Sequence, residues 1–281
     1  MASDAHAHPE NLLHLFPEAE KQRRKLGVAC AASSSNKTEI IYHEQIARSA
    51  KKDNAPPLFL CFAVHPQLPS SLSFDHSKHI SAFQLFLKQF FLDKLDLLSL
   101  LASEVRIDAV GECGFDLYSQ SFRETEAVQD ELFIHHLEIA RRHDLPIVLH
   151  VRRAMHKIFP HTKILKTLPA VVFHSWPGVP DEAFSLLRKG ICAFFSFGTA
   201  LLLNHKNAIR SCAELPVEHL LFETDAPYQP LKGKVFSSWE DLPAIIGEAA
   251  KIRKETGAKK GTETEELEEN TDKNFFRVFK R

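Results

Sequence analysis

The segment Pro146-Ile-Val-Leu-His150 is a short apolar run that ends on a side chain able to bind a metal ion. Four other runs end in the same way and read Asp4-Ala-His-Ala-His8, Ile107-Asp-Ala-Val-Gly-Glu112, Ala170-Val-Val-Phe-His174 and Leu220-Leu-Phe-Glu-Thr-Asp225. Short, near-continuous apolar runs are typical of strands that are buried on both faces of a parallel sheet. In a (β/α)8 barrel the C-terminal ends of the strands converge on one face, where the chemistry lies. We therefore expect these polar ends to meet at one site.

The rest of the chain favours such a barrel. Candidate strands lie near residues 2–8, 26–32, 58–64, 107–112, 146–150, 170–174, 190–196 and 219–223. Helices are expected between them at Asn36–Lys52, Ile80–Ser103, Phe122–Arg142, Asp181–Lys189 and Leu242–Thr256. Alternation of strands and helices over the whole length predicts one α/β domain, residues 1–281, with a parallel sheet. Eight units favour a closed TIM-type barrel, and no Gly-x-Gly-x-x-Gly follows the first strand to suggest a dinucleotide-binding fold.

Three polar segments are expected to lie outside the regular elements. Lys51–Pro57 and Gln67–Lys78 are rich in Pro, Ser and charge, and we expect loops there. Ala258–Glu269 is charged and of low complexity, which predicts a flexible link to an additional C-terminal helix at Thr271–Lys280. Three phenylalanines on one side of that helix are expected to dock it on the barrel.

Composition excludes several classes of protein. The chain has 281 residues, 44% of them hydrophobic, and a formal net charge of −1, which excludes polyanion binding by bulk charge alone. Its five cysteines are odd in number and form no Cys-x-x-Cys, so we expect a reducing compartment without disulfides. The N-terminus lacks the features of a secretion signal, and the apolar stretch Phe83–Leu101 is too often interrupted by charge to span a membrane. We expect a cytoplasmic protein.

Each candidate metal donor could instead have a purely structural role. His6 and His8 alternate on a strand, so both side chains point to the same side, although a chance pair near a chain end would look the same. Glu112 directly follows a buried strand, where a charge is costly unless it is paired or coordinates a metal. The alternative is a carboxylate that caps the next helix, a role for which Asp116 is the more natural candidate.

The other three donors carry alternatives of the same kind. A single histidine at a strand end, such as His150 or His174, is more often a hydrogen-bonded core residue than a ligand. Asp225 precedes Ala226-Pro227 and could simply form a turn. The metal-site hypothesis depends on the conjunction of six donors at five strand ends.

The motifs around these donors resemble those of the TatD family of metal-dependent deoxyribonucleases, part of the amidohydrolase-like barrel superfamily. They read D-A-H-A-H (4–8), V-G-E-C-G-F-D (110–116), L-H-V-R-R-A (149–154), F-H-S-W-P-G (173–178) and E-T-D-A-P-Y (223–228). Asn274-Phe-Phe-Arg-Val-Phe279 resembles the N-x-x-R-x-F that closes the family's sequences. The resemblance runs from the first ten residues of the chain to the last ten.

The resemblance implies two metal positions. His6 and His8 would hold the first ion with Asp225, His150 and His174 would hold the second, and Glu112 would bridge the two. A set of four imidazoles and two carboxylates favours Zn²⁺ or Mn²⁺, and the resemblance keeps Mg²⁺ as an alternative.

Two further segments are compared with the family. His65 lies in Ala63-Val-His-Pro66, which resembles the family's G-x-H-P element near the substrate, although Pro66 could equally fix it as a turn residue. Ser175-Trp-Pro177 departs from the more usual Cys-Phe-Thr. Trp176 would either stack on a base or pack in the wall, and we favour packing.

The resulting hypothesis is a hydrolase that cleaves phosphodiester bonds of DNA. Two ions about 3.5–4 Å apart can stabilise the attacking and leaving oxygens, and the hydroxide they generate would attack phosphorus. Glu112 and Asp225 are the catalytic carboxylates in this hypothesis, with Asp225 orienting the hydroxide or taking its proton. The resemblance implies 3′-to-5′ exonuclease action on single strands or ends.

Cationic residues after the strands would bind the phosphate. Arg152 and Arg153 follow His150 and are the candidate substrate-binding residues. His156 and Lys157 follow in the same loop, and Lys232 and Lys234 follow Asp225 in the corresponding way. The alternative for the arginine pair is a solvated helix N-terminus.

Two other functions remain open. A barrel hydrolase of small amides, lactones or phosphoesters is the main alternative; many such enzymes bridge their metals with a carbamylated lysine, but here Glu112 takes that place and no lysine ends a candidate strand. A non-enzymatic scaffold is disfavoured because all six candidate ligands are present. Nothing in the sequence indicates a membrane or an obligate protein partner.

Overall fold

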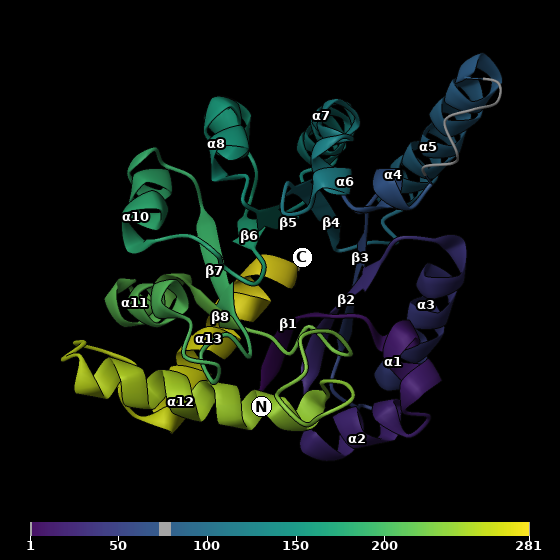
Figure 1. Cartoon of the computed structure of the whole chain (residues 1–281). Coiled ribbons are helices and arrows are strands. Elements are labelled where there is room, and N and C mark those ends of the chain that lie inside the picture. The colour runs from purple at the N-terminus through teal and green to yellow at the C-terminus, as the bar shows by residue number, and fades with distance from the viewer. Residues whose placement is uncertain (1, 73–79, 281) are drawn as a thin grey trace.

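Eight parallel strands form the centre of the computed structural model, which describes residues 2–72 and 80–280 (Figure 1). They are β1 (Ser3–Ala7), β2 (Ala29–Ser34), β3 (Leu58–Phe62), β4 (Ala109–Asp116), β5 (Ile147–Arg152), β6 (Val171–Phe173), β7 (Ala193–Phe197) and β8 (Leu220–Phe222). Each strand pairs with the next one along the chain. The ring is joined where Asp225 N donates to His6 O and His8 N donates to Ala226 O, at 3.0 and 2.7 Å. The prediction of a TIM-type (β/α)8 barrel is confirmed.

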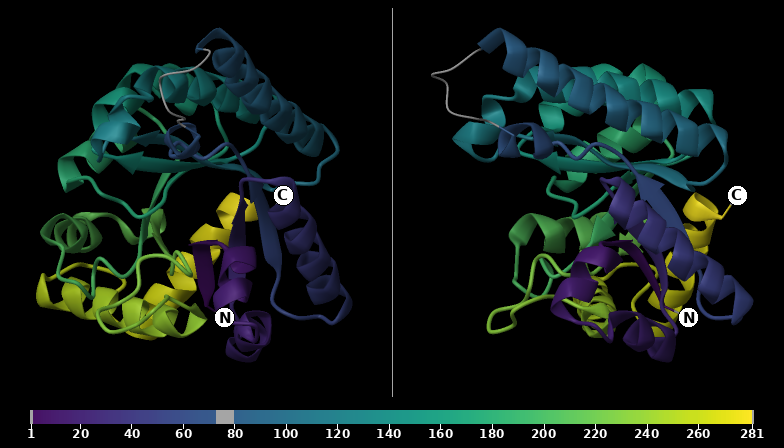
Figure 2. Two further views of the ribbon diagram at one scale, coloured as in Figure 1. Left: turned by 45° about the vertical axis from the view of Figure 1, so that its right-hand side comes forward. Right: turned by 90° about the vertical axis from the view of Figure 1, so that its right-hand side faces the viewer.

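Helices surround this ring, and α5 lies alongside α7 on its outer side (Figures 1 and 2). In chain order they are α1 (Pro9–Leu15), α2 (Ala19–Leu26), α3 (Lys37–Lys52), α4 (Leu68–Ser71), α5 (Ile80–Ser103), α6 (Gln120–Arg123), α7 (Glu126–Arg142), α8 (Met155–Ile158), α9 (Thr162–Leu165), α10 (Pro180–Arg188), α11 (Lys206–Glu214), α12 (Leu242–Glu255) and α13 (Thr264–Phe279). All five expected helices between the strands are present. The one expected at Phe122–Arg142 is interrupted at residues 124–125, which separates α6 from α7.

The apolar core has two parts. One lies between the strands and the outer helices, as expected for strands that bury both faces. The other fills the barrel and consists mostly of small side chains, with a few large ones: Ala5, Ala29, Ala31, Cys61, Ala109, Val148, Ala170, Val172, Phe194 and Leu221. The barrel is therefore a packed body rather than a channel.

Helix α13 covers the end of the barrel where the strands begin. Phe275 and Phe279 are fully buried against the interior residues, and the Phe275 ring lies 5.4 Å from that of Phe59. The side-chain amide of Asn274 donates to the carbonyl groups of Val217 and Leu220 at the start of β8. The opposite end of the barrel, where the strands finish, is left for the polar side chains.

The start of α13 corrects one expectation. We expected a flexible link at Ala258–Glu269 and a helix from Thr271, but the helix begins at Thr264 and includes the second half of that segment. Leu267 and Thr271 are buried and extend the inward-facing stripe of the helix by two turns. The acidic residues between them occupy the solvent side, so the charged composition concealed an amphipathic helix.

The two polar segments that were expected to be loops are partly helical. Within Gln67–Lys78, expected as a loop, Leu68–Ser71 form the short helix α4, and residues 73–79 lie outside the described residues. Within Lys51–Pro57, helix α3 continues to Lys52 before the loop begins. Among the described residues, no helix combines the length and the apolar character needed to cross a bilayer.

A buried histidine on α7 fixes the chain just after β3. His136 Nε2 accepts a hydrogen bond from Val64 N at 2.9 Å, so its proton is on Nδ1, which lies 2.6 Å from the Leu132 carbonyl oxygen. Burial lowers the pKa of His136 to about 4, and the imidazole is neutral at pH 7. Because Val64 precedes His65, this hydrogen bond helps to place a loop of the metal-binding end.

Replacing His136 should therefore change the acid sensitivity of the fold. Between pH 6.5 and about 4, only the unfolded chain binds the His136 proton, so stability falls as the pH falls through this range. The His136→Gln variant lacks this contribution. Between pH 7 and pH 5 it should lose about 2 kcal/mol less unfolding free energy than the parent protein. Urea unfolding of metal-free protein at both pH values measures the difference, and equal losses in the two proteins would contradict the assignment.

Candidate metal centre

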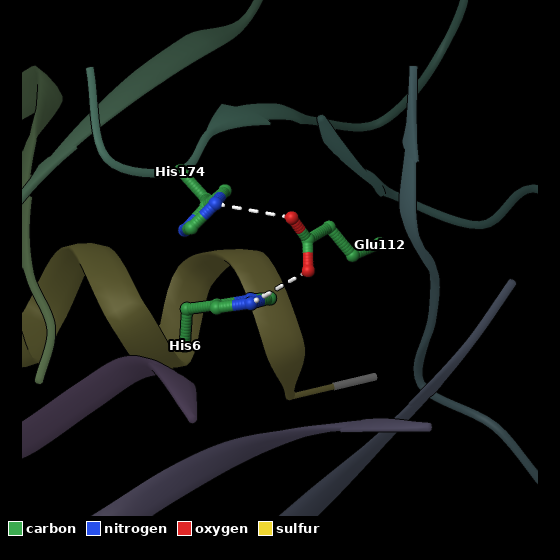
Figure 3. Close-up of side chains that lie close together, drawn as sticks. All are labelled: His6, Glu112 and His174. Atoms are coloured by element: carbon green, nitrogen blue, oxygen red, sulfur yellow. Dashed lines mark hydrogen bonds and ion pairs between the residues drawn. The ribbon is translucent and has the colours of Figure 1, made fainter. Parts of the chain in front are cut away.

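The six predicted metal donors meet at the end of the barrel where the strands finish. Glu112, on β4, lies at the centre and is 4% exposed. Its Oε2 is 3.1 Å from His6 Nε2, and its Oε1 is 3.1 Å from His174 Nε2 (Figure 3). The same Oε1 is 2.6 Å from His150 Nδ1. His6 Nε2 and His8 Nε2 are 3.2 Å apart, so the two rings point to the same side as the alternation predicts. Asp225 Oδ1 lies 3.4 Å from His8 Nε2.

His65 also belongs to this cluster. Its Nε2 is 3.1 Å from Glu112 Oε1, close to His150. From the sequence we expected His65 near the substrate; the structure brings it as close to Glu112 as His6 and His174, at 3.1 Å.

Three sets of donor atoms are close enough to surround an ion. They are His6 with His8 and Asp225, His6 with Glu112 and His174, and His65 with Glu112 and His150; within each set the atoms lie within 4.8 Å of one another. The first set matches the expected first position. His150 and His174, expected to share the second ion, fall in different sets that have Glu112 in common. Glu112 directs one oxygen to each side, which is the geometry of a bridging carboxylate.

Glu112 reaches the centre because of a bulge in β4. The register pairs Gly111 with Val148 and Cys113 with Leu149, so Glu112 is an additional residue without a partner on β5. The flanking glycines let the two strands approach. A Cβ on Gly111 would lie 2.5 Å from Val148 Cβ, and one on Gly114, where φ is +131°, would collide with the His150 carbonyl oxygen. A similar irregularity between Asp4 and Ala7 in β1 precedes His8.

Two carboxylates behind the cluster orient its imidazoles. Glu223 Oε1 accepts from Ser175 N at 2.8 Å and lies 3.0 Å from His174 Nδ1, so that Nε2 faces Glu112. Asp116 Oδ2 lies 3.0 Å from His150 Nε2, so that Nδ1 faces Glu112. With a metal bound, each ring would keep its proton on the outer nitrogen and direct the lone pair of its inner nitrogen to the ion, as metal ligation requires.

The position of Asp116 corrects a second expectation. We expected it to cap the following helix, but the N-cap of α6 is Ser119, which accepts from Phe122 N. Asp116 is fully buried and instead accepts from Gln67 Nε2 at 2.7 Å and from Tyr118 N at 2.9 Å, in addition to its contact with His150. Sequence reasoning missed the orienting roles of both residues, because Asp116 was interpreted as a helix cap and Glu223 as part of the run that ends on Asp225.

Asp4 ties the first strand to the segment that carries Asp225. Its carboxylate accepts from Thr224 Oγ1 at 2.6 Å, from Thr224 N at 3.1 Å and from His6 N at 3.1 Å. Complete burial raises the pKa of Asp4 to about 7, although the hydrogen bonds from Thr224 oppose the shift. The sequence alone predicted no role for Asp4.

The central carboxylates are ionised despite their burial. Burial alone would raise the pKa of Glu112, but the imidazoles of His65, His174 and His6 outweigh it and hold the pKa well below its usual range. Burial is likewise outweighed at Asp225, where the hydrogen bond with His8 and the charges of His174 and His6 lower the pKa. A compact group of imidazoles around anionic oxygens is the donor chemistry that a divalent transition metal requires.

The cluster forms the floor of a cavity of about 1040 Å³. Arg152 lies on its wall, and the guanidinium groups of Arg152 and Arg153 lie 3.8 and 4.6 Å from the centre of the Tyr118 ring. Lys157 is paired with Glu126 and Asp130, and Lys234 with Asp241, so neither has a free charge for phosphate as we had expected.

Trp176 packs in the wall, as favoured from the sequence. It is 2% exposed, lies against Phe173 and Phe195, and donates from Nε1 to Ser211 Oγ at 3.1 Å. It is therefore not a free stacking surface for a base.

Comparison with known proteins identifies the family. The family described as TatD related DNase matches residues 3–280. The chain belongs to this family. A TatD-family relative from Dickeya dadantii, named "3'-5' ssDNA/RNA exonuclease TatD", is 33% identical over 196 residues, which are 67% of this chain and 70% of the relative.

Two further proteins are similar over different lengths. The "uncharacterized metal-dependent hydrolase YcfH" of Escherichia coli K12 is 32% identical over 184 residues, and the match covers 64% of this chain and 65% of that relative. The crystal structure of YjjV, a TatD homologue from Escherichia coli, superposes with a TM-score of 0.76 at 22% identity and covers 100% of this chain and 98% of that one. This last likeness supports the barrel fold.

Replacing Asp116 tests whether it sets the orientation of His150. In Asp116→Asn the side-chain oxygen should remain on Tyr118 N, which turns the NH₂ group towards His150 Nε2. The imidazole must then carry its proton on Nδ1, where it faces Glu112 and blocks a metal. We expect Mn²⁺ affinity, measured by titration calorimetry, to fall by about 10- to 100-fold. Asp130→Asn, which alters an outer carboxylate paired with Lys157, should bind Mn²⁺ as the parent does.

Proposed function

We propose that this protein hydrolyses phosphodiester bonds of single-stranded DNA, removing nucleotides from the 3′ end with the help of two divalent metal ions. The observation that carries the proposal is the bridging position of Glu112 among inward-facing imidazoles at the floor of an open cavity. Membership of the TatD family and the name of the Dickeya relative support nucleic acid as the substrate class.

The donor set suits two ions. His6, His8 and Asp225 would hold one. His65, His150 and His174, which all contact Glu112 Oε1, would contribute to the other, with Glu112 between the two ions. The nitrogen-rich mixture favours Zn²⁺ or Mn²⁺ over Mg²⁺. When bound, such ions polarise the phosphate and lower the pKa of a water molecule towards about 7.

The remaining tasks fall to the protein's own side chains. Asp225 Oδ1 faces the cluster and is the carboxylate oxygen available to orient the attacking water and accept its proton. Glu112 keeps its charge during this transfer because the surrounding imidazoles stabilise it. Arg152 binds the phosphate group from the wall of the cavity, and its stacking on Tyr118 fixes the plane of the guanidinium before the substrate arrives.

Binding of the nucleic acid is local rather than driven by overall charge. The net charge of −1 gives no field that would hold a long duplex. Contacts confined to the cavity favour a strand end over an internal site. A small amide or lactone is the alternative substrate for a barrel of this kind.

Digestion of end-labelled oligonucleotides tests the proposal. With Mn²⁺, single-stranded DNA labelled at its 5′ end should shorten progressively, whereas label at the 3′ end should appear at once as mononucleotide. EDTA should abolish cleavage, and added Mn²⁺ should restore it. Activity that survives chelation would contradict the two-metal mechanism. Turnover of a lactone, without turnover of an oligonucleotide or a nitrophenyl phosphodiester, would support the alternative substrate class.

Removing the arginine pair tests its role in substrate binding. Arg152→Ala combined with Arg153→Ala should raise KM for single-stranded DNA more than it lowers kcat, because the phosphate loses its cationic partners while the metal donors are unchanged. Lys157→Ala, whose charge is already paired, should leave KM close to that of the parent. An unchanged KM in the double variant would show that neither arginine binds the substrate and that both are solvated surface residues.

A further inference from the structure

The segment after Asp225 has an unusual backbone close to the candidate metal centre. Asp225 and Gln229 both have φ of +53°, and Ser175, which faces them from the end of β6, has φ of +45°. None of the three is glycine, so each adopts a left-handed conformation that its side chain disfavours. Such conformations persist when surrounding contacts hold them.

The side chain of Gln229 supplies those contacts. Its Nε2 donates to Asp225 Oδ2 at 2.6 Å and to Ser175 Oγ at 3.1 Å. The main-chain carbonyl oxygen of Gln229 accepts from Thr199 Oγ1 at 2.9 Å. Gln229 therefore connects the segments that follow β6, β7 and β8, at the rim of the cavity.

The two oxygens of Asp225 consequently have different environments. Oδ1 faces the imidazoles and lies 3.4 Å from His8 Nε2 and 3.8 Å from His6 Nε2. Oδ2 is occupied by the amide hydrogen of Gln229, in a short hydrogen bond to a charged acceptor. A carboxylate held in this way offers one oxygen to an ion, whereas a free carboxylate can rotate and offer either one or both.

We propose that Gln229 is a positioning residue that restricts Asp225 to binding through Oδ1 alone. The inference rests on the proposed function only in taking Asp225 as a metal ligand. Gln229 itself touches neither ion nor reacting atoms in this proposal; it acts through the orientation of Asp225. Because Oδ2 is already engaged, Oδ1 is the oxygen that both contacts the metal and faces the attacking water.

The test removes the donor without changing the length of the side chain. Gln229→Met has the same reach but no hydrogen to donate, and Gln229 is exposed, so the fold should tolerate the change. Gln89→Met is the matched control, since Gln89 Nε2 donates to Asp93 Oδ1 at 2.7 Å on the exposed side of α5. Mn²⁺ binding is measured by titration calorimetry, and kcat and KM are measured with single-stranded DNA.

We expect one of the Mn²⁺ affinities of Gln229→Met to fall about tenfold, a loss typical of a residue that orients a ligand. The value of kcat should fall while KM stays within about twofold, and the control should match the parent in every measurement. Thr199→Val, which removes only the anchor of the Gln229 main chain, should lose a smaller part of the same affinity.

Wild-type Mn²⁺ affinity in both Gln229→Met and Thr199→Val would overturn the inference. A higher KM with unchanged Mn²⁺ binding would also overturn it, because Gln229 would then be a substrate contact. The calorimetric measurement needs no substrate. If the parent protein cleaves no phosphodiester while Gln229→Met still loses Mn²⁺ affinity, the proposed function fails and the positioning role stands.

Discussion

The buried carboxylate of Glu112 is the constraint on which the rest of this molecule depends. A negative charge that is 4% exposed needs compensation, and here four imidazoles surround it at 2.6–3.1 Å. That arrangement requires a bulge in β4, two glycines that let β5 approach, and outer carboxylates that turn the imidazoles inward. Together these features orient the candidate donors towards one another before any metal ion binds.

The barrel separates this polar end from the part that supplies stability. Where the strands begin, the interior is apolar and α13 seals it with aromatic side chains. Where the strands finish, polar side chains from different strands contact one another, as Glu112 contacts His6, His150 and His174. Loops at that end tolerate left-handed residues such as Ser175 and Asp225 because the packed barrel beneath them is rigid.

Much of this organisation could be predicted from the sequence, because the signals were local. Apolar runs predicted all eight strands, and the polar residues that end five of these runs predicted six candidate donors, which the structure brings together. The predicted start of α13 was wrong because the charged composition of this segment indicated a flexible link and hid the buried positions of Leu267 and Thr271. The prediction that Asp116 caps a helix was wrong. Helix capping is predicted from neighbouring residues, whereas Asp116 contacts His150 and Gln67, which are 34 and 49 positions away in the sequence. Gln229 carried no signal, since its hydrogen bond depends on a backbone conformation that its residue type does not favour.

The seal formed by α13 has a consequence for how the chain is completed during synthesis. The eighth strand ends at Phe222 and the last candidate donor is Asp225, but α13 begins only at Thr264. A ribosome-bound chain can therefore contain every candidate donor while one end of its barrel still exposes the alanine-rich lining to water. Until Phe275 and Phe279 emerge, that lining is apolar surface that chaperones or other chains can contact.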